Sequence, residues 1–311
     1  MTRPELDAVL ARLDADLDPA LERLFALLRI PSISTDPAHA SDCRAAADHL
    51  AAELAGLGLD ASRRDTEGRP MVVAHGDALA APDAAGPSLL FYGHYDVQPV
   101  DPLELWRRDP FDPALEDGPR GQVIRARGAA DDKGQLTTFV EACRAWLAET
   151  GSLPARVSLL LEGEEESGSP SLVPFLKAHR EELSRDLALI CDTGMFDADT
   201  PAVTATLRGL MGEEIVIHAA DRDLHSGLYG AAAANPIRVL ARILADLHDE
   251  TGRVTLDGFY DDVGEPEPAM KAQWERLGFD PAAFLGEVGL SHPAGEADRS
   301  ALEQVWSRPT C

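Results

Sequence analysis

The segment Val157-Ser158-Leu159-Leu160-Leu161-Glu162-Gly163-Glu164-Glu165-Glu166 joins an apolar stretch directly to a group of acids. The uncharged residues 157–161 predict a strand that is buried on both faces in the middle of a sheet. A solvated group of charges seldom follows such a strand directly. The acids are therefore predicted to lie at the end of a central strand, where α/β folds place their functional sites.

Short apolar segments elsewhere predict the rest of this sheet. Further strands are expected at residues 71–74, 88–92 and 187–190. Apolar residues at three- and four-residue steps predict one or two helices that end before Pro31, a helix at about 42–57 and another around 136–147. Strands that alternate with helices predict an α/β fold with a mostly parallel sheet flanked by helices.

Length and texture predict two domains. At 311 residues the chain exceeds what one hydrophobic core usually serves. We expect an α/β domain at residues 1–206 and a smaller α+β domain at residues 207–311. In the second domain, residues 214–218 predict a strand, and residues 235–247 predict a helix with Pro236 in its first turn.

Charge and hydropathy exclude several classes of partner. The 54 acidic and 28 basic residues give a net charge of -26, which repels nucleic-acid phosphates and anionic membranes. The first residues lack the apolar core of a signal peptide, and no later stretch approaches the roughly 18 apolar residues of a membrane span. We therefore expect a cytoplasmic protein that binds neither nucleic acid nor membrane.

Histidine and aspartate follow the predicted strand at 88–92 in the sequence Gly93-His94-Tyr95-Asp96. The two-residue period of a strand puts His94 and Asp96 on the same side, so the carboxylate could orient the imidazole as a metal-bound histidine requires. The alternative is a histidine that caps the end of a strand.

Paired acids precede the helix around 136–147, and another acid follows the strand at 187–190. Asp131 and Asp132 could cap the helix, but two adjacent carboxylates repel each other unless a cation lies between them. Lys133 could partly compensate their charge. Asp192 could supply a further oxygen ligand, or it could be an ordinary turn residue.

The glutamates at 164–166 add a base to this set. Consecutive side chains of extended backbone point in opposite directions, so one glutamate could bind a metal while its neighbour faces the attacking water. One imidazole with several carboxylates suits Zn²⁺, Mn²⁺ or Co²⁺. Two such ions about 3.5 to 4 Å apart would lower the pKa of a bridging water and hold the substrate carbonyl, as amide hydrolysis requires.

These segments, in this order, resemble the dinuclear zinc metallopeptidase family that includes carnosine dipeptidase, cytosolic nonspecific dipeptidase, glutamate carboxypeptidase and the acetylornithine and succinyl-diaminopimelate deacylases. The resemblance extends over nearly the whole chain and is greatest to the dipeptidase branch. The segments that carry it are residues 90–99, Trp106 with 109–111, 127–134, 162–169 and 223–227. It implies the N-terminal part of a zinc-peptidase-like catalytic domain at 1–206, incomplete in this sequence, and part of an inserted lid and dimerisation domain at 207–311.

The resemblance implies a set of metal ligands. His94 and Asp192 would hold one ion, Asp131 would bridge both ions, and Glu166 would hold the second. The peptide bond between Asp131 and Asp132 would be cis. The cofactors would be two divalent ions, with Zn²⁺ expected first and Mn²⁺ or Co²⁺ as alternatives.

Catalytic roles are implied in the same way. Glu165 would be the general base that activates water, and Asp96 would support His94. His225, in the lid, would reach the active site of the partner subunit in a homodimer and stabilise the oxyanion of the tetrahedral intermediate. Its alternative is a polar turn residue before Ser226 and Gly227.

The implied activity is hydrolysis of dipeptides in the cytoplasm, with deacylation of N-acyl amino acids as an alternative. One departure from the family stands out. In the family, the chain returns from the lid to the catalytic domain and supplies a last histidine for the second metal, whereas this sequence stops at Cys311. We therefore expect the functional form to continue past Cys311. The remaining alternative is an inactive protein that binds at most one metal well.

Overall fold

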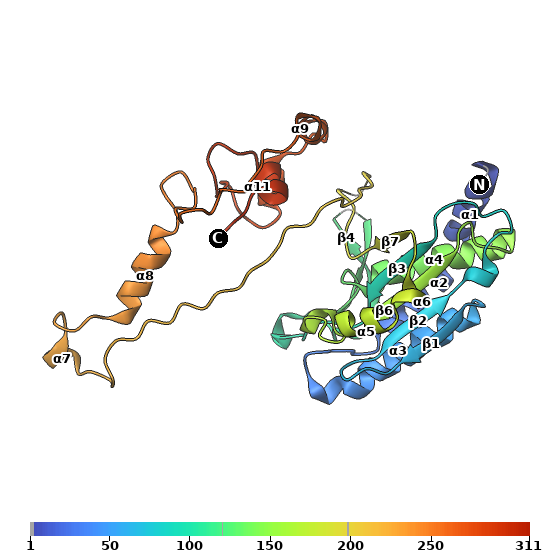
Figure 1. The fold of residues 1–311 in the computed structure, drawn as a ribbon, viewed down its shortest axis with the longest axis horizontal. Helices are drawn as coiled ribbons and strands as arrows, with labels where there is room; N and C mark the ends of the chain where they lie inside the picture. The colour runs from blue at the N-terminus through green and yellow to red at the C-terminus, as the bar shows by residue number, and fades with distance from the viewer. Residues whose placement is uncertain (1–2, 120, 198) are drawn as a thin grey trace. The chain divides into compact units, whose positions relative to one another are not determined.

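The computed structural model describes residues 3–119, 121–197 and 199–311 (Figure 1). The chain divides into two compact units, Met1–Val203 and Thr204–Cys311. The first unit contains every strand that pairs into a sheet within the described residues. The second unit contains short helices joined by long loops.

The first unit is built on a sheet of five strands. Their order across the sheet is β1 (Asp60–Arg64), β2 (Met71–His75), β6 (Val157–Glu162), β3 (Leu89–His94) and β7 (Leu187–Ile190). β6 is the central strand, and all six of its residues are buried. The prediction of a central buried strand at 157–161 is therefore confirmed, as are the strands expected at 71–74, 88–92 and 187–190.

The sheet is mixed, so the expectation of a mostly parallel sheet is confirmed only in part: β2 alone runs opposite to the other four strands. β3 pairs in parallel with β6 and β7, but β2 is antiparallel to both β1 and β6. β1 was not predicted, because its sequence Asp-Ala-Ser-Arg-Arg carries no apolar alternation. Only residues 65–70 separate it from β2, and so short a connection joins antiparallel neighbours.

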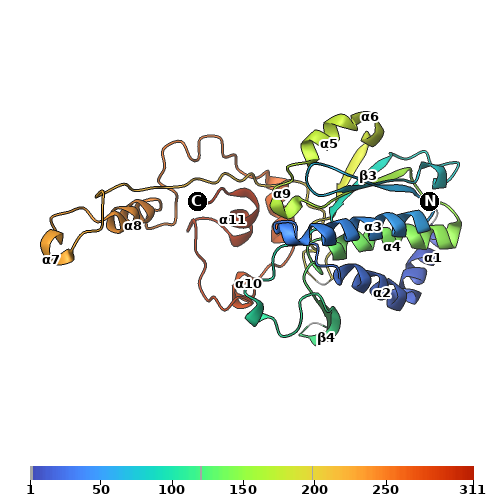
Figure 2. The same ribbon diagram turned by 90° about the horizontal axis from the view of Figure 1, so that it is seen from below.

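Helices cover both faces of the sheet (Figure 2). α3 (Ala40–Gly56) and α4 (Lys133–Thr150) lie on one face, and α5 (Leu172–Ala178) and α6 (Arg180–Leu183) lie on the other. α1 (Arg3–Ala15) and α2 (Leu17–Leu28) pack against α4. Leu159 and Leu161 of β6 belong to the core cluster shared with α3 and α4. Leu160 belongs to the cluster on the other face, with Phe175 of α5. Because successive side chains of β6 point to opposite faces, this one strand packs against helices on both sides of the sheet.

Smaller elements complete the first unit. They are the hairpin of β4 (Ala114–Gly118) and β5 (Gly121–Arg125), and the 3-10 helices η1 (Pro37–His39), η2 (Asp77–Leu79), η3 (Leu103–Leu105) and η4 (Glu165–Ser167). Of these, η4 bears on the site, because it contains two of the three consecutive glutamates.

The second unit has α7 (Ser226–Tyr229), α8 (Pro236–Asp246), α9 (Pro268–Glu275), α10 (Pro281–Gly286) and α11 (Ala301–Ser307). The helix expected at 235–247 is confirmed: the Asn235 side chain accepts hydrogen bonds from the first turn of α8. The strand expected at 214–218 is wrong. No strand pairs with this segment in the described structure, and a strand without a neighbour leaves its backbone groups unpaired.

Across the described residues, no helix combines the length and the apolar character needed to cross a membrane.

Core packing around β3 gives a first prediction. Phe91 is fully buried and stacks on Phe139 of α4, with 4.1 Å between ring centroids. We expect Phe91→Ala to lower the free energy of unfolding by about 3–5 kcal/mol. Its register partner on β7, Leu189, is 40% exposed, so Leu189→Ala should cost less than about 1 kcal/mol. Denaturant unfolding followed by circular dichroism measures both losses, and equal losses would contradict this core.

Candidate metal centre

Apart from His225, the residues singled out in the sequence lie at one edge of the first unit. His94 ends β3, the glutamates at 164–166 follow β6, and Asp192 follows β7. Because these three strands are parallel, their carboxyl ends meet at the same edge. Asp131 lies just before α4, on the connection that reaches the same edge. Its peptide bond to Asp132 is cis, as the resemblance implied.

His94, Asp131 and Asp192 form a group that could hold a metal ion. The Nε2 atom of His94 lies 3.0 Å from Asp131 Oδ1 and 3.6 Å from Asp192 Oδ2, and the three ligand atoms lie within 4.8 Å of one another. The imidazole is buried, whereas the Asp131 side chain is 61% exposed. One nitrogen and two carboxylate oxygens, open to solvent on one side, fit a catalytic Zn²⁺ or a related ion. Among the described residues, this is the one such group.

Asp96 supports the backbone of the turn after β6 as well as the side chain of His94. Its fully buried carboxylate lies 3.4 Å from His94 Nδ1 and also accepts the backbone N–H groups of Glu165 at 3.2 Å and Glu166 at 3.1 Å. These bonds tie the 3-10 turn η4, which contains Glu165 and Glu166, to Asp96. The expectation of an extended backbone with opposed glutamates is therefore wrong. The sequence signalled the pair of His94 and Asp96, but it carried no sign of the two amide bonds.

Glu165 and Glu166 are both partly buried at the edge of this group. Burial raises the pKa of both carboxyl groups, and the negative charge of Asp131 adds to the rise. A raised pKa suits a carboxylate that must take up a proton near neutral pH. Glu166 lies outside the three-residue group, and its Oε2 accepts a hydrogen bond from Gln98 at 2.7 Å.

Asp132 has a role at this edge that sequence reasoning missed. It makes no side-chain cap to α4; instead its buried carboxylate accepts the backbone N–H of His94 at 3.1 Å. Burial raises its pKa to about 7. Within the described part of the chain, its Oδ1 has no hydrogen-bond partner. The only sequence signal was the adjacency of two acids.

Lys133 does not neutralise the paired aspartates, as its position in the sequence suggested. Its buried ammonium donates to the carbonyls of Leu27 at 3.2 Å and Ile30 at 2.7 Å, at the C-terminal end of α2. Burial lowers the pKa of this lysine to about 7. The ammonium is therefore not available to pair with the acids at the edge of the sheet.

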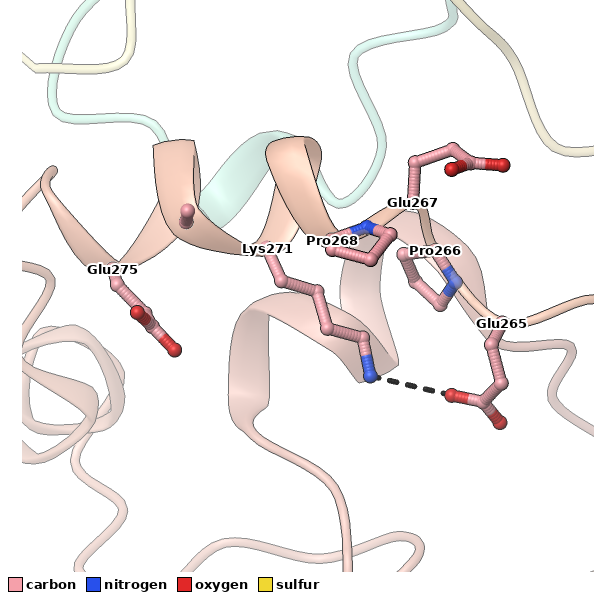
Figure 3. Close-up of a pocket in the computed structure, with 7 residues that line it drawn as sticks. Glu265, Pro266, Glu267, Pro268, Lys271 and Glu275 are labelled. Carbon is pink, nitrogen blue, oxygen red and sulfur yellow. Dashed lines mark hydrogen bonds and ion pairs between the residues drawn. The ribbon is translucent and has the colours of Figure 1, made fainter.

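His225 lies in the second unit, and its role towards another subunit stays a prediction. Locally, its Nδ1 accepts the N–H of Gly227 at 2.9 Å and caps α7. A hollow in the same unit runs along α9, where Lys271 is ion-paired with Glu265 at 3.2 Å (Figure 3). None of the residues predicted for the site lines this hollow.

A mixed α/β sheet that gathers an imidazole and several carboxylates at its parallel strand ends is typical of metal-dependent hydrolases. Comparison with known protein families shows which family of hydrolases the chain belongs to. The model of peptidase family M20/M25/M40 matches residues 90–305, and the chain belongs to this family.

Individual relatives indicate which branch of the family the chain resembles. Cys-Gly metallodipeptidase dug1 of Schizosaccharomyces pombe is 27% identical over 98% of this chain and 65% of its own length. Cysteinylglycine-S-conjugate dipeptidase of Corynebacterium striatum is 30% identical over 94% of this chain and 63% of its own length. The resemblance to the dipeptidase branch is thus confirmed, and the chain spans less than two thirds of these relatives.

A solved structure shows the same fold. Human carnosine dipeptidase 1 superposes with a TM-score of 0.75 at 22% identity, over 98% of this chain and 65% of that structure. The zinc-peptidase-like architecture expected for the first unit therefore agrees with an experimental fold of the family.

The contacts of His94 give a second prediction, for the metal-free protein. Burial alone lowers the pKa of His94, but the hydrogen bond to Asp96 and the surrounding carboxylates outweigh it and raise the pKa to about 10. The interactions of the protonated His94 with these carboxylates therefore stabilise the fold fully below about pH 6.5. Their contribution is lost as the pH rises through about 10. NMR titration of the imidazole measures the midpoint. Asp96→Asn should lower it towards 6.5, and an unchanged midpoint would contradict the assigned contact.

Proposed function

We propose that this protein hydrolyses the peptide bond of dipeptides with the help of bound divalent metal ions. The observation that carries the proposal is the group of His94, Asp131 and Asp192, with ligand atoms within 4.8 Å of one another, beside Glu165. Membership of a peptidase family and relatives named as dipeptidases support the same reaction.

The proposed metal positions are those that the family resemblance implies, and the group of His94, Asp131 and Asp192 agrees with the first of them. His94 and Asp192 would hold the first ion and Asp131 would bridge to a second, which Glu166 would hold after release from Gln98. Two ions, Zn²⁺ first and Mn²⁺ or Co²⁺ as alternatives, would supply a water of lowered pKa and a polarised substrate carbonyl. The backbone carbonyl and the carboxylate of Asp96, 3.1 and 3.4 Å from Nδ1, hold the His94 ring so that Nε2 faces Asp131 and Asp192, where the ion would lie.

Glu165 carries the proton in this proposal. It accepts a proton from the attacking water as the oxygen bonds to the carbonyl carbon, and returns it to the nitrogen as the C–N bond breaks. His225 donates a hydrogen bond to the oxyanion, from the lid of a partner subunit in a homodimer. Residues 1–206 would then belong to the catalytic domain and residues 207–311 to the lid. We place the reaction in the cytoplasm.

The same residues would serve a deacylase of N-acyl amino acids, because the reaction at the carbonyl is identical. The two substrates differ only in the group beyond the bond that is cleaved. A substrate panel with dipeptides, acetylated amino acids and succinylated amino acids therefore separates the two activities. Preference for an acylated amino acid would overturn the dipeptidase assignment.

Removal of the base gives a third prediction. Glu165→Gln preserves shape but cannot take up the proton, so kcat for a dipeptide should fall about 10²–10⁴-fold while Zn²⁺ affinity stays close to that of the wild type. The matched control is Glu181→Gln, the same substitution at an exposed position of α6. Colorimetric detection of released amino acids measures the rate, and full activity of Glu165→Gln would refute the role of Glu165.

Metal content gives a fourth prediction. One complete ligand group lies within the described residues, so we expect one tightly bound Zn²⁺ per 311-residue chain and weaker binding of a second ion. Asp192→Asn should weaken the tight site at least about 10-fold, whereas Asp83→Asn, at an exposed position, should not. Equilibrium dialysis with metal analysis gives both numbers. Tight binding of one ion without hydrolysis of any substrate would favour the non-catalytic alternative.

A further inference from the structure

The first of the three consecutive glutamates, Glu164, differs from the other two in its contacts. Its side chain is buried, and each carboxylate oxygen accepts a backbone N–H: Oε1 from Arg69 at 2.9 Å and Oε2 from Ser171 at 3.2 Å. Arg69 belongs to the loop between β1 and β2, and Ser171 is the residue directly before α5. One carboxylate therefore joins two segments that are far apart in the sequence.

The loop is shaped to receive this carboxylate. At Gly68, a Cβ atom would lie 1.6 Å from Glu164 Oε1, so any other residue would displace the carboxylate. On the other side of Arg69, the carbonyl of Pro70 accepts the buried hydroxyl of Tyr95 at 2.5 Å. The loop at 66–70 thus contacts both the end of β6, through Glu164, and the residue after His94.

The backbone of Glu164 begins the turn that carries the site. Its carbonyl accepts the N–H groups of Ser167 at 3.1 Å and Ser169 at 2.8 Å, which close η4. The amides of Glu165 and Glu166 in that turn donate to Asp96, which contacts His94. A displaced Glu164 would move the turn, and with it the donors that hold Asp96.

We propose that Glu164 is a positioning residue, which fixes the turn of Glu165 and Glu166, and through Asp96 the orientation of His94, by clamping the loop at 66–70 to the start of α5. The inference rests on the proposed function, because it assigns Glu164 to the same site. The three glutamates then have different roles. Glu164 accepts hydrogen bonds from backbone amides, whereas Glu165 would take up the proton and Glu166 would bind a metal ion.

The experiment perturbs this contact from both sides. Glu164→Gln keeps the size of the side chain but places an NH₂ group against one of the two amide donors. Gly68→Ala leaves the glutamates intact and displaces the carboxylate from the loop. The matched control is Asp186→Asn, because Asp186 Oδ2 likewise accepts a backbone N–H, from Ser88 at 2.8 Å, at the opposite ends of β3 and β7.

Two readouts are made on the full 311-residue chain. Residue-resolved amide exchange should rise about 10-fold at Glu165 and Glu166 in Glu164→Gln and in Gly68→Ala, because the turn opens more often. Zn²⁺ affinity, measured with the metal alone against a chromogenic chelator, should fall about 10-fold in both variants. Asp186→Asn should change neither quantity, even where it lowers the melting temperature.

The outcomes separate this inference from the proposed function. Wild-type exchange at Glu165 and Glu166 together with wild-type Zn²⁺ affinity in both variants would overturn the inference and leave the function standing. The same rise in Asp186→Asn would overturn it too, since general destabilisation would then explain the effect. A wild-type protein that binds no Zn²⁺ would refute the function, and the exchange data alone would still decide whether Glu164 fixes the turn.

Discussion

The buried carboxylate of Asp96 is the contact on which this site depends. A charge removed from water must be matched by hydrogen bonds or by opposite charge, and Asp96 finds both in His94 and in the amides of Glu165 and Glu166. These partners come from two adjacent parallel strands, β3 and β6. The register of the two strands places His94 beside Glu162, so the turn after β6 falls within reach of Asp96.

The acids of the site fall into two groups, according to whether they accept backbone amides or face solvent. Asp96 and Glu164 are buried and accept backbone amides, which makes them part of the scaffold. Asp131 and Asp192 face solvent beside a single imidazole. An overall charge of -26 makes this concentration of acids costly unless a cation joins it. The first kind determines where backbone lies, and the second kind determines what the edge of the sheet can bind.

Much of the fold followed from apolar periodicity, because burial selects for it directly. β6 and α4 were predicted for this reason, whereas β1 was not, since its partly buried residues carry no apolar pattern. Strand direction depends on connections and neighbours, so the antiparallel pairing of β2 was missed. The strand expected at 214–218 shows the converse: in the described structure, an apolar pattern forms no strand where no partner strand is present.

The site was predicted less completely. Strand ends and acid spacing located His94, Asp131 and Asp192, whereas the roles of Asp132 and Glu164 depend on contacts between side chains and distant backbone amides. Backbone amides leave no trace in the sequence, because every residue except proline has one. For the same reason, the 3-10 turn at Glu165 could not be told from an extended segment.

The two edge strands of the sheet differ in charge and in exposed apolar surface, so a further strand would be favoured at one edge over the other. At β1, Arg63 pairs with Asp48 and Arg64 pairs with Glu182, so the edge carries charges that discourage a further strand. At β7, Leu187 and Ile190 are more than half exposed. A strand that extends this sheet, from the same polypeptide or from another, would therefore be favoured next to β7, the strand whose end leads to Asp192.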